Sequence, residues 1–190
     1  MGVESRRMAE LIAAAIAEIG EAGTLDVTVG RIAKRAGVSP ALAFHYFGDK
    51  DRLFLAAMRH ILAAYGRDVR SALRAADGPR ARLDALIGAS FGPANFERGT
   101  VAAWLNFYVL AQHVPEARRL LTVYQRRLHA NLLHDLRPLA GDRSETIARR
   151  IGALIDGLYL RSVHAVTEVS REEVAALVRQ TLAQSLDAVE

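Results

Sequence analysis

The chain contains no cysteine, and aromatic residues make up only 6% of its 190 residues. Without cysteine it can form no disulfide scaffold, no zinc finger with thiolate ligands, no iron–sulfur site and no thiol nucleophile. This absence suits a reducing compartment. The chain is long enough to bury a hydrophobic core without cross-links.

Long hydrophobic runs are also missing. The longest stretch free of Asp, Glu, Lys and Arg covers residues 99–115, which is shorter than the roughly 20 residues that a membrane helix needs. The apolar residues that follow Arg7 are interrupted by Glu10 and Glu18, unlike those of a signal peptide. We therefore expect a soluble, cytoplasmic protein with no membrane partner.

Motifs for catalysis, cofactors or metals do not support an enzyme. The sequence has neither an H-E-x-x-H motif nor a phosphate-binding glycine loop. His129 and His134 would lie about 140° apart on a helix and make no metal pair. Residues 88–92 match G-x-S-x-G, but that motif works on a strand-to-helix turn, and the residues before it fit a helix. We expect no enzymatic activity, no cofactor and no metal site.

Charge gives only a weak indication of function. The net charge is +4 and the sequence pI is about 9.8, which weakly favours a nucleic-acid partner. Residues 1–50, however, hold as many acidic as basic side chains. DNA binding by this segment would therefore depend on where its charges are placed.

Apolar residues recur every three or four positions along the whole chain, and no segment alternates apolar and polar residues as a strand would. Ser170 and Glu173 have the spacing of a capping box. The pattern predicts an all-α fold of about nine helices. The apolar stripes end at Gly23, Gly37, Gly48, Asp77-Gly78-Pro79, Gly92-Pro93, Val114-Pro115 and Pro138.

Two short predicted helices, residues 28–36 and 39–47, are joined by Gly37-Val38-Ser39. This spacing is typical of a helix-turn-helix motif. Thr28 and Ser39 are expected N-caps, and Pro40 fixes the first turn of the second helix. The free N–H groups at that helix start favour contact with an anion.

The second of these helices is expected to read DNA. Ala41 and Ala43 are predicted to face outward, where small side chains allow close approach to base edges and thymine methyl groups. His45 and Tyr46 add hydrogen-bond donors, and Lys50 is placed to contact a phosphate. The alternative is an ordinary three-helix packing unit in which Phe44 and Phe47 belong to the core.

Residues 28–53 resemble the DNA-binding domain of TetR-type regulators, through Thr28-Val29-x-x-Ile32-Ala33-x-x-Ala36-Gly37-Val38-Ser39-x-x-x-x-Phe44-His45-Tyr46-Phe47-x-Asp49-Lys50-x-x-Leu53. The resemblance implies a two-fold dimer bound to double-stranded DNA. It also implies roles for single residues. Thr28 would contact phosphate, Ser39, Ala41 and His45 would face bases, and Tyr46 and Lys50 would contact the DNA backbone. The family often has Tyr where Phe44 stands, so a hydroxyl contact is absent here.

The C-terminal region is similar to the BetI subgroup of choline-responsive repressors. The residues that carry this likeness are Ala103-Trp104-Leu105-x-Phe107-Tyr108, Arg126-Arg127-Leu128-x-x-Asn131-Leu132 and Leu154-Ile155-Asp156-Gly157-Leu158-Tyr159-Leu160-Arg161. In this family the C-terminal helices bind the effector.

Aromatic side chains near one carboxylate suggest a site for a cationic effector, since aromatic faces attract quaternary ammonium ions. Asp156 would be the counter-ion, or else it pairs inside its own bundle, with Arg161 or a cap. The aromatic residues could equally pack as core. The candidate ligand-binding residues are Trp104, Phe107, Tyr108, Tyr124, Asp156 and Tyr159.

The last two predicted helices carry apolar stripes, and Gly152, Ala153 and Gly157 would let another helix approach closely. Two such helices from each of two chains would form a four-helix homodimer interface. The candidate interface residues are Ile151, Leu154, Ile155, Leu158, Leu177 and Val178.

The sequence therefore predicts a DNA-binding domain over residues 5–65, with its motif at 28–47, and an effector-binding and dimerisation domain over residues 66–190. We expect a transcriptional regulator that acts as a repressor. A small-molecule effector would release it from a palindromic operator. A helical binding or adaptor protein without a DNA role is the alternative.

Overall fold

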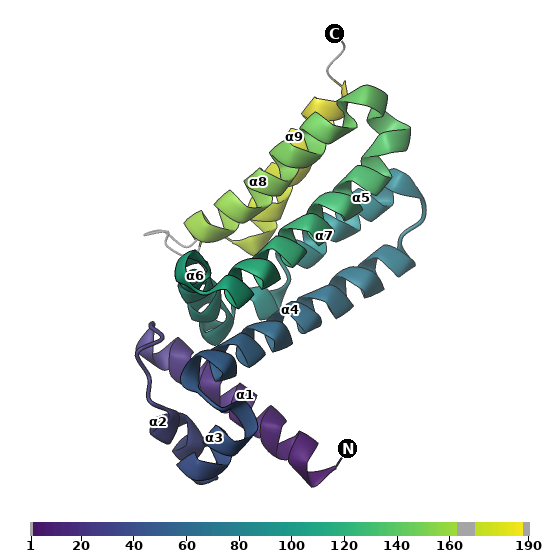
Figure 1. Ribbon diagram of the computed structural model, residues 1–190. Coiled ribbons are helices and arrows are strands. Elements are labelled where there is room, and N and C mark those ends of the chain that lie inside the picture. Colours follow the sequence, from purple (N-terminus) through teal and green to yellow (C-terminus); the bar gives the residue numbers. More distant parts are fainter. Residues whose placement is uncertain (1, 163–169, 188–190) are drawn as a thin grey trace. The chain divides into compact units, whose positions relative to one another are not determined.

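The computed structural model describes residues 2–162 and 170–187. In these ranges the chain forms nine α-helices and two short 3₁₀ helices, with no strand, which confirms the predicted all-α fold (Figure 1). In chain order the elements are α1 (Val3–Ala22), α2 (Val29–Arg35), α3 (Pro40–Phe47), α4 (Lys50–Ala75), α5 (Gly78–Ser90), η1 (Pro93–Phe96), α6 (Arg98–His113), α7 (Pro115–Ala140), η2 (Gly141–Arg143), α8 (Ser144–Ser162) and α9 (Arg171–Asp187).

Local side chains determine where several helices begin. The Asp49 carboxylate accepts a hydrogen bond from the Arg52 backbone N–H at 2.8 Å before α4. Ser170 and Glu173 form the predicted capping box at α9, with bonds of 3.1 and 2.9 Å. Each cap satisfies a backbone N–H that the first helical turn leaves without a partner.

Pro138 does not end α7 as the sequence suggested. The helix continues through this proline to Ala140. Proline fixes φ near the helical value, but it removes the hydrogen bond to the carbonyl four residues earlier and crowds that carbonyl. The helix ends two residues after the proline, at Ala140.

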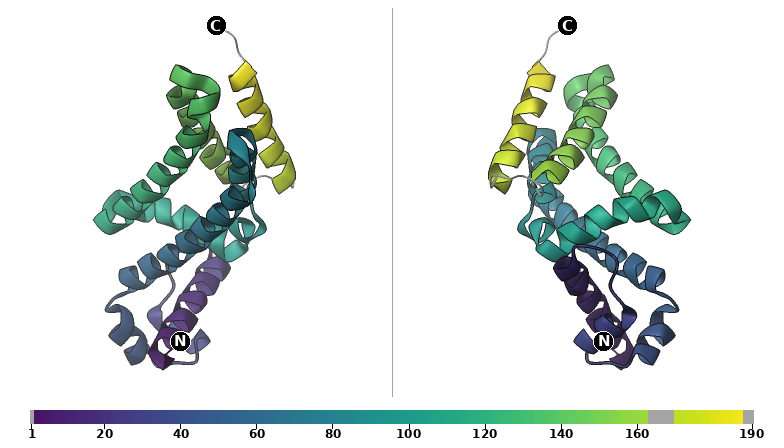
Figure 2. Two further views of the ribbon diagram at one scale, coloured as in Figure 1. Left: turned by 90° about the vertical axis from the view of Figure 1, so that its right-hand side faces the viewer. Right: turned by 90° about the vertical axis from the view of Figure 1, so that its left-hand side faces the viewer.

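The helices pack into two compact units, each considered by itself. The first contains α1–α3, α4 up to Ala63 and residues Glu97–Leu121, and the second contains Ala64–Phe96 and the described residues from Thr122 onward. In the first unit α1 packs on both α2 and α6, and in the second α9 packs on α5 and α8 (Figure 2). The predicted functional division after residue 65 concerns DNA binding and effector binding, and it stays a prediction.

Each unit has its own apolar core. Among the described residues, no helix is both long and apolar enough to cross a membrane. In the first unit the fully buried side chains include Leu11, Ala15, Ile32 and Ala33. In the second they include Leu83, Leu86, Ile87, Leu132, Leu136, Ile151 and Val178.

Candidate functional site

A helix-turn-helix lies at α2 and α3, as predicted. The Thr28 hydroxyl accepts a hydrogen bond from the Arg31 N–H, and the Ser39 hydroxyl accepts one from the Leu42 N–H, each at 3.2 Å. Between the helices Gly37 has φ of +66°, a conformation that glycine adopts without steric cost. Both predicted N-caps are therefore present and fix the start of each helix.

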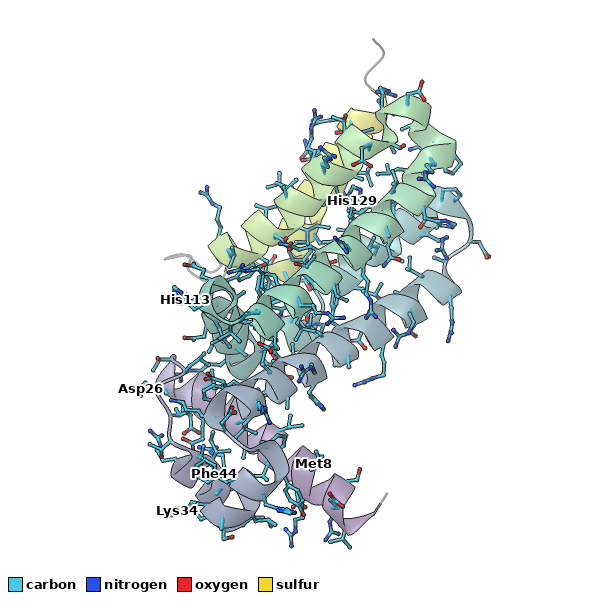
Figure 3. The ribbon with its side chains drawn as sticks, in the orientation of Figure 1. Met8, Asp26, Lys34, Phe44, His113 and His129 are labelled. Carbon is cyan, nitrogen blue, oxygen red and sulfur yellow. The ribbon has the colours of Figure 1, made fainter. Side chains whose placement is uncertain are left out.

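Helix α3 has one buried and one exposed face. Ala43 and Phe47 are buried, at 1% and 8% exposure. Ala41, Phe44 and His45 are exposed and lie three or four residues apart, so that they share the outer face. The expectation that Ala43 faces outward was wrong, because its Cβ belongs to the buried stripe. The outer apolar group is Phe44, whose side chain is 48% exposed and which Figure 3 labels on this helix.

The other residues predicted to contact DNA lie around this face. Ser39 and Pro40 are exposed at the start of α3. Tyr46 is half-buried, and its ring centroid lies 5.6 Å from that of His45. The Lys50 ammonium stands over the Phe54 ring, 5.5 Å from the centroid. Cation–π attraction of this kind positions the ammonium group at the start of α4.

Ion pairs neutralise much of the positive charge on α2. The Glu18 carboxylate of α1 pairs with Arg31 and Arg35, each at 2.7 Å, and Glu21 also pairs with Arg35. The hydrogen bond from Arg35 outweighs the burial of Glu18 and lowers the pKa of its carboxyl group. These pairs attach α2 to α1.

Helix α6 is fixed to α1 within the first unit. A Cβ added at Gly20 would lie 2.7 Å from the Gly99 Cα, so the two backbones are in direct contact. The Asn106 side-chain amide donates to the Gly23 carbonyl at the end of α1, at 3.2 Å. The helix that carries three of the predicted effector residues therefore packs against α1, in the same unit as the helix-turn-helix.

Those three residues form one aromatic cluster. Trp104 and Phe107 are buried, with ring centroids 6.1 Å apart in an edge-to-face arrangement. The Tyr108 ring lies 5.9 Å from that of Trp104 and is half-buried. The three rings therefore pack together along α6.

The other three predicted effector residues lie in the second unit. The Tyr124 hydroxyl donates to the Asp156 carboxylate at 3.0 Å. Burial raises the pKa of the Asp156 carboxyl group, and the Tyr124 hydrogen bond partly offsets this effect. Tyr159, one turn beyond Asp156 on α8, donates to the Asn95 carbonyl at 2.8 Å. The six predicted residues thus divide equally between the two units.

The structure adds Tyr65 of α4 to this cluster, a residue that the sequence analysis placed only on an apolar stripe. Its ring centroid lies 5.7 Å from that of Tyr124. Burial raises the pKa of the Tyr65 hydroxyl to about 12, the hydrogen bond with Ser90 opposes the rise, and the charge of Asp156 adds to it. This electrostatic effect places a negative charge close to the tyrosine.

Ser90, the serine of the G-x-S-x-G sequence, supports this cluster. Its hydroxyl donates to the Leu86 carbonyl at 2.9 Å and therefore accepts from the Tyr65 hydroxyl at 3.1 Å. Ser90 lies in α5, and the described residues contain no strand that could build a nucleophile turn. The serine of this motif thus lies at the end of a helix, as the pattern of the preceding residues predicted.

A further aromatic edge lies beside Tyr159. The Phe96 and Tyr159 ring centroids are 5.4 Å apart in an edge-to-face arrangement, and Phe91 lies 6.5 Å from Phe96. No sequence pattern indicated Phe96, because it lies in a short 3₁₀ turn outside any apolar stripe. In the described part of the chain no three His, Asp or Glu side chains are grouped to hold a metal.

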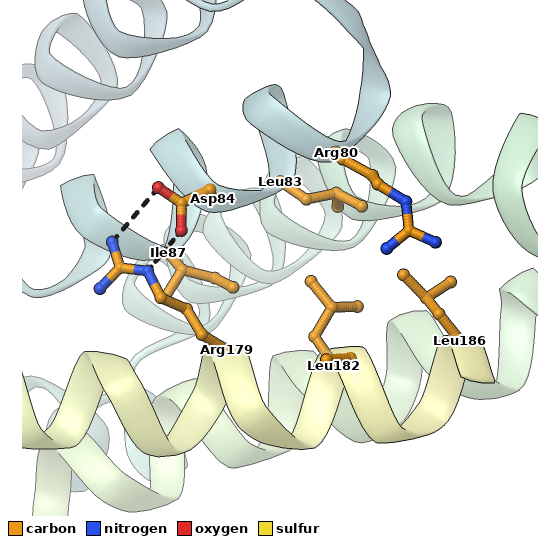
Figure 4. A pocket seen from close by; sticks show the side chains of 8 residues that line it. Arg80, Leu83, Asp84, Ile87, Arg179, Leu182 and Leu186 are labelled. Atoms are coloured by element: carbon orange, nitrogen blue, oxygen red, sulfur yellow. Dashed lines mark hydrogen bonds and ion pairs between the residues drawn. The ribbon is translucent and has the colours of Figure 1, made fainter. Parts of the chain in front are cut away.

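A separate cavity of about 150 Å³ lies between α5 and α9 (Figure 4). Aliphatic side chains including Leu83, Ile87 and Leu182 line it, and an ion pair between Asp84 and Arg179 crosses its rim. No aromatic side chain lines this cavity. It therefore lacks the aromatic faces that attract a quaternary ammonium ion.

The residues predicted for a dimer interface have different exposures in the single chain. Ile151, Ile155 and Val178 are at most 2% exposed because they pack in the chain's own core. Leu154 and Leu158 are half-buried, and Leu177 is 47% exposed. Only the last three have side-chain area that a second copy could still cover.

Two family models match the chain, and both describe the same kind of transcriptional regulator. The model for bacterial regulatory proteins of the tetR family matches residues 11–57. The model for the C-terminal region of BetI-type transcriptional repressors matches residues 79–187.

Curated relatives span nearly the whole chain. The HTH-type transcriptional regulator BetI of Brucella suis biovar 1 is 48% identical over 187 residues, covering 98% of this chain and 94% of that protein. The regulator of the same name from Rhizobium meliloti is 48% identical over 178 residues, covering 93% of this chain and 88% of that protein.

Solved structures share the fold. A transcriptional regulator from Pseudomonas aeruginosa PAO1 has a TM-score of 0.81 at 28% identity, covering 98% of this chain and 92% of that chain. A regulator from Saccharomonospora viridis, solved in complex with choline, has a TM-score of 0.85 at 20% identity, covering 94% and 96%. With the helix-turn-helix at α2 and α3, these matches show that the chain belongs to the TetR family of bacterial transcriptional regulators, with a C-terminal region of the BetI repressor type.

Proposed function

We propose that the protein is a homodimeric repressor that binds a palindromic operator and is released from it by a small quaternary ammonium compound of the choline type. The observation that carries the effector class is the half-buried Asp156 carboxylate among tyrosine rings. The choline in the structure from Saccharomonospora viridis and the BetI-type C-terminal match support the same class. The adaptor alternative has no specific observation in its favour.

The outer face of α3 is proposed to enter the major groove. Ala41 and His45 are exposed there, and Lys50 stands at the start of the next helix. Thr28, Tyr46 and Lys50 would contact the DNA backbone, because helix N-termini and ammonium groups attract phosphate. Ser39 would face bases beside Ala41 and His45. In a dimer the two reading helices would address grooves about 34 Å apart.

Asp156 is proposed as the counter-ion of the effector. Burial disfavours its charged form, and a bound cation would remove that penalty. The Tyr124 hydroxyl donates to it, the Tyr65 ring lies against the Tyr124 ring, and Tyr159 follows one turn later on α8. Each cation–π contact contributes about 0.5–2 kcal/mol, so two or three contacts with one carboxylate suit micromolar binding.

Helix α4 is proposed to carry the effect of the ligand to the DNA-reading helices. It is one continuous helix from Lys50 to Ala75, so that Lys50 and Tyr65 belong to the same element. A cation beside Asp156 would interact with Tyr124 and Tyr65, and a shift of Tyr65 would move α4. Release follows if the bound state disfavours the spacing that DNA requires.

Isothermal titration calorimetry tests the effector class. The purified protein is titrated with choline and with its neutral isostere, in which carbon replaces the ammonium nitrogen. We expect choline to bind at least ten-fold more tightly than the isostere. Asp156→Asn should remove this preference, while Asp142→Asn, at an exposed carboxylate of the same unit, should keep it. Choline affinity should also fall at acid pH, as Asp156 becomes protonated.

Equal binding of choline and the isostere would refute the cationic class and leave the family assignment intact. The contribution of Trp104, Phe107 and Tyr108 stays a prediction from the sequence, and Trp104→Ala tests it in the same titration. Operator binding is tested separately, by selecting genomic fragments with the purified protein and measuring the salt dependence of their affinity.

A dimer interface on α8 and α9 is proposed around Leu154, Leu158 and Leu177. Ala153 is exposed on the same helix as Leu154, and Gly157 has open space where a Cβ would be. Small residues of this kind permit close helix approach. Light scattering of the wild type checks the two-chain mass.

A further inference from the structure

Phe44 is a large apolar side chain in an unusual place for a single folded chain. It is 48% exposed, and it lies on α3, the second helix of the helix-turn-helix, whose outer face is proposed to enter the major groove. Ala43 and Phe47 on the same helix are buried, so α3 has an inner face whose apolar side chains pack in the core. The exposure of Phe44 therefore follows from its position on the other face of the helix.

The ring makes no aromatic or cation–π contact within the described chain. The His45 ring pairs with Tyr46, and Phe44 takes part in no aromatic pair or cation–π contact among the described residues. Ala41, one turn earlier on the same face, has only a methyl side chain. The phenyl ring is thus free to contact whatever the outer face of α3 meets.

The chemistry of the ring restricts what it can recognise on DNA. A phenyl group has no hydrogen-bond donor or acceptor, so it cannot read the polar edge of any base. In the major groove thymine alone presents a methyl group, at C5. Ala41 and His45, which flank Phe44 on the exposed face, are the positions expected to meet base edges.

We propose that Phe44 packs on the C5 methyl group of a thymine in the operator and makes that position specific for thymine. This inference rests on the proposed operator binding. A ring packed instead on the sugars of the DNA backbone would add affinity without sequence preference, and the experiment below separates the two.

The test removes the methyl group from the DNA. An operator is first selected with the wild-type protein, and each thymine is then replaced in turn by deoxyuridine, which pairs identically but lacks the methyl. Burial of one methyl-sized group corresponds to about a four-fold change in affinity. We expect such a loss at one thymine per half-site, and about a sixteen-fold loss when both half-sites of a dimer operator are substituted.

Variants assign that loss to Phe44. Phe44→Ala should bind thymine and uracil operators equally at that position, whereas Phe44→Leu, which stays apolar and long, should keep most of the discrimination. Val109→Ala removes another exposed apolar side chain of the same unit, at 59% exposure on α6, and should leave discrimination unchanged. Circular dichroism checks that each variant is folded.

Each outcome decides the inference. If no single thymine-to-uracil change weakens wild-type binding, or if Phe44→Ala keeps the full discrimination, the proposed thymine contact is wrong. The ring then either packs on the sugars of the DNA backbone or makes no contact with DNA. Failure to select any DNA would instead refute the proposed operator binding. The two failures are therefore distinguishable.

Discussion

The crossing of α1 and α6 gives the sharpest stability prediction. Gly20 and Gly99 meet there without side chains. A Cβ on Gly20 would lie 2.7 Å from the Gly99 Cα and 2.9 Å from its backbone nitrogen. Normal carbon contacts are about 3.5–4.0 Å, so Gly20→Ala requires the helices to separate by about 1 Å.

The expected cost is the balance of two opposing effects. Overpacking of this kind typically costs about 1–3 kcal/mol, and here the obstacle is backbone that no rotamer change can remove. Alanine in a helix is favoured over glycine by up to about 1 kcal/mol. We expect Gly20→Ala to lower the free energy of unfolding by about 1–2 kcal/mol. Gly99→Ala should act similarly, because its Cβ would lie 2.9 Å from the Ile16 carbonyl oxygen.

Urea denaturation with tryptophan fluorescence measures this effect. The chain has one tryptophan, Trp104, and it is buried on α6 close to the crossing. Gly66→Ala is the matched control, since its Cβ would meet only the flexible end of Arg70, at 3.3 Å. The control should keep or slightly increase stability, by helix propensity.

Equal or greater stability of Gly20→Ala would refute the reasoning. It would mean that α1 and α6 separate at no cost, and that their close contact does not hold α6 to the DNA-reading helices. We also expect weaker DNA binding for Gly20→Ala than for Gly66→Ala, because α1 positions α2 through Glu18.

Four further predictions concern single side chains. Glu18→Gln should destabilise the fold by about 1–2 kcal/mol at pH 7 in urea denaturation. Because Arg35 lowers the pKa of Glu18 from 4.5, the difference in stability between variant and wild type should disappear as pH falls through the folded-state pKa. Asp156→Asn should raise the thermal midpoint at neutral pH without effector, since burial raises the Asp156 pKa above 3.8 and the charged carboxylate lowers stability above that raised pKa. The gain in thermal midpoint should shrink as pH falls through the raised pKa. No gain at neutral pH would contradict burial as the cause. Leu177→Asp, at a 47% exposed site, should give folded monomers by light scattering, and an intact dimer would exclude Leu177 from the interface. Lys50→Ala should weaken binding to all DNA sequences and reduce the salt slope by about one, so an unchanged slope would exclude a phosphate contact.

The dimer prediction changes once burial is known. From the sequence, Ile151 and Leu177 are equivalent members of apolar stripes on the last two helices. In the structure Ile151 is fully buried in its own chain, so a charge there would unfold the unit and could not isolate dissociation. Leu177 is the cleaner probe, because its change leaves the core untouched.

The sequence alone also did not determine which face of α3 is buried. Small residues at 41 and 43 both suited close approach to DNA, and the helix period alone did not say which stripe was buried. Packing of α3 against α2 places Ala43 and Phe47 inside, which turns Ala41, Phe44 and His45 outward. A rotation of the helix by two positions, about 200°, would have buried Ala41 and exposed Ala43.

The sequence by itself determined the all-α fold, most helix boundaries and the helix-turn-helix, because these depend on residues at most four positions apart. Caps such as Thr28 and Ser39 act within one turn, and periodicity records which side of each helix is apolar. Only the tertiary structure decided what surrounds Asp156. Its bond to Tyr124 spans 32 positions and the bond of Tyr65 to Ser90 spans 25, and such pairs depend on how whole helices pack, which no local spacing encodes.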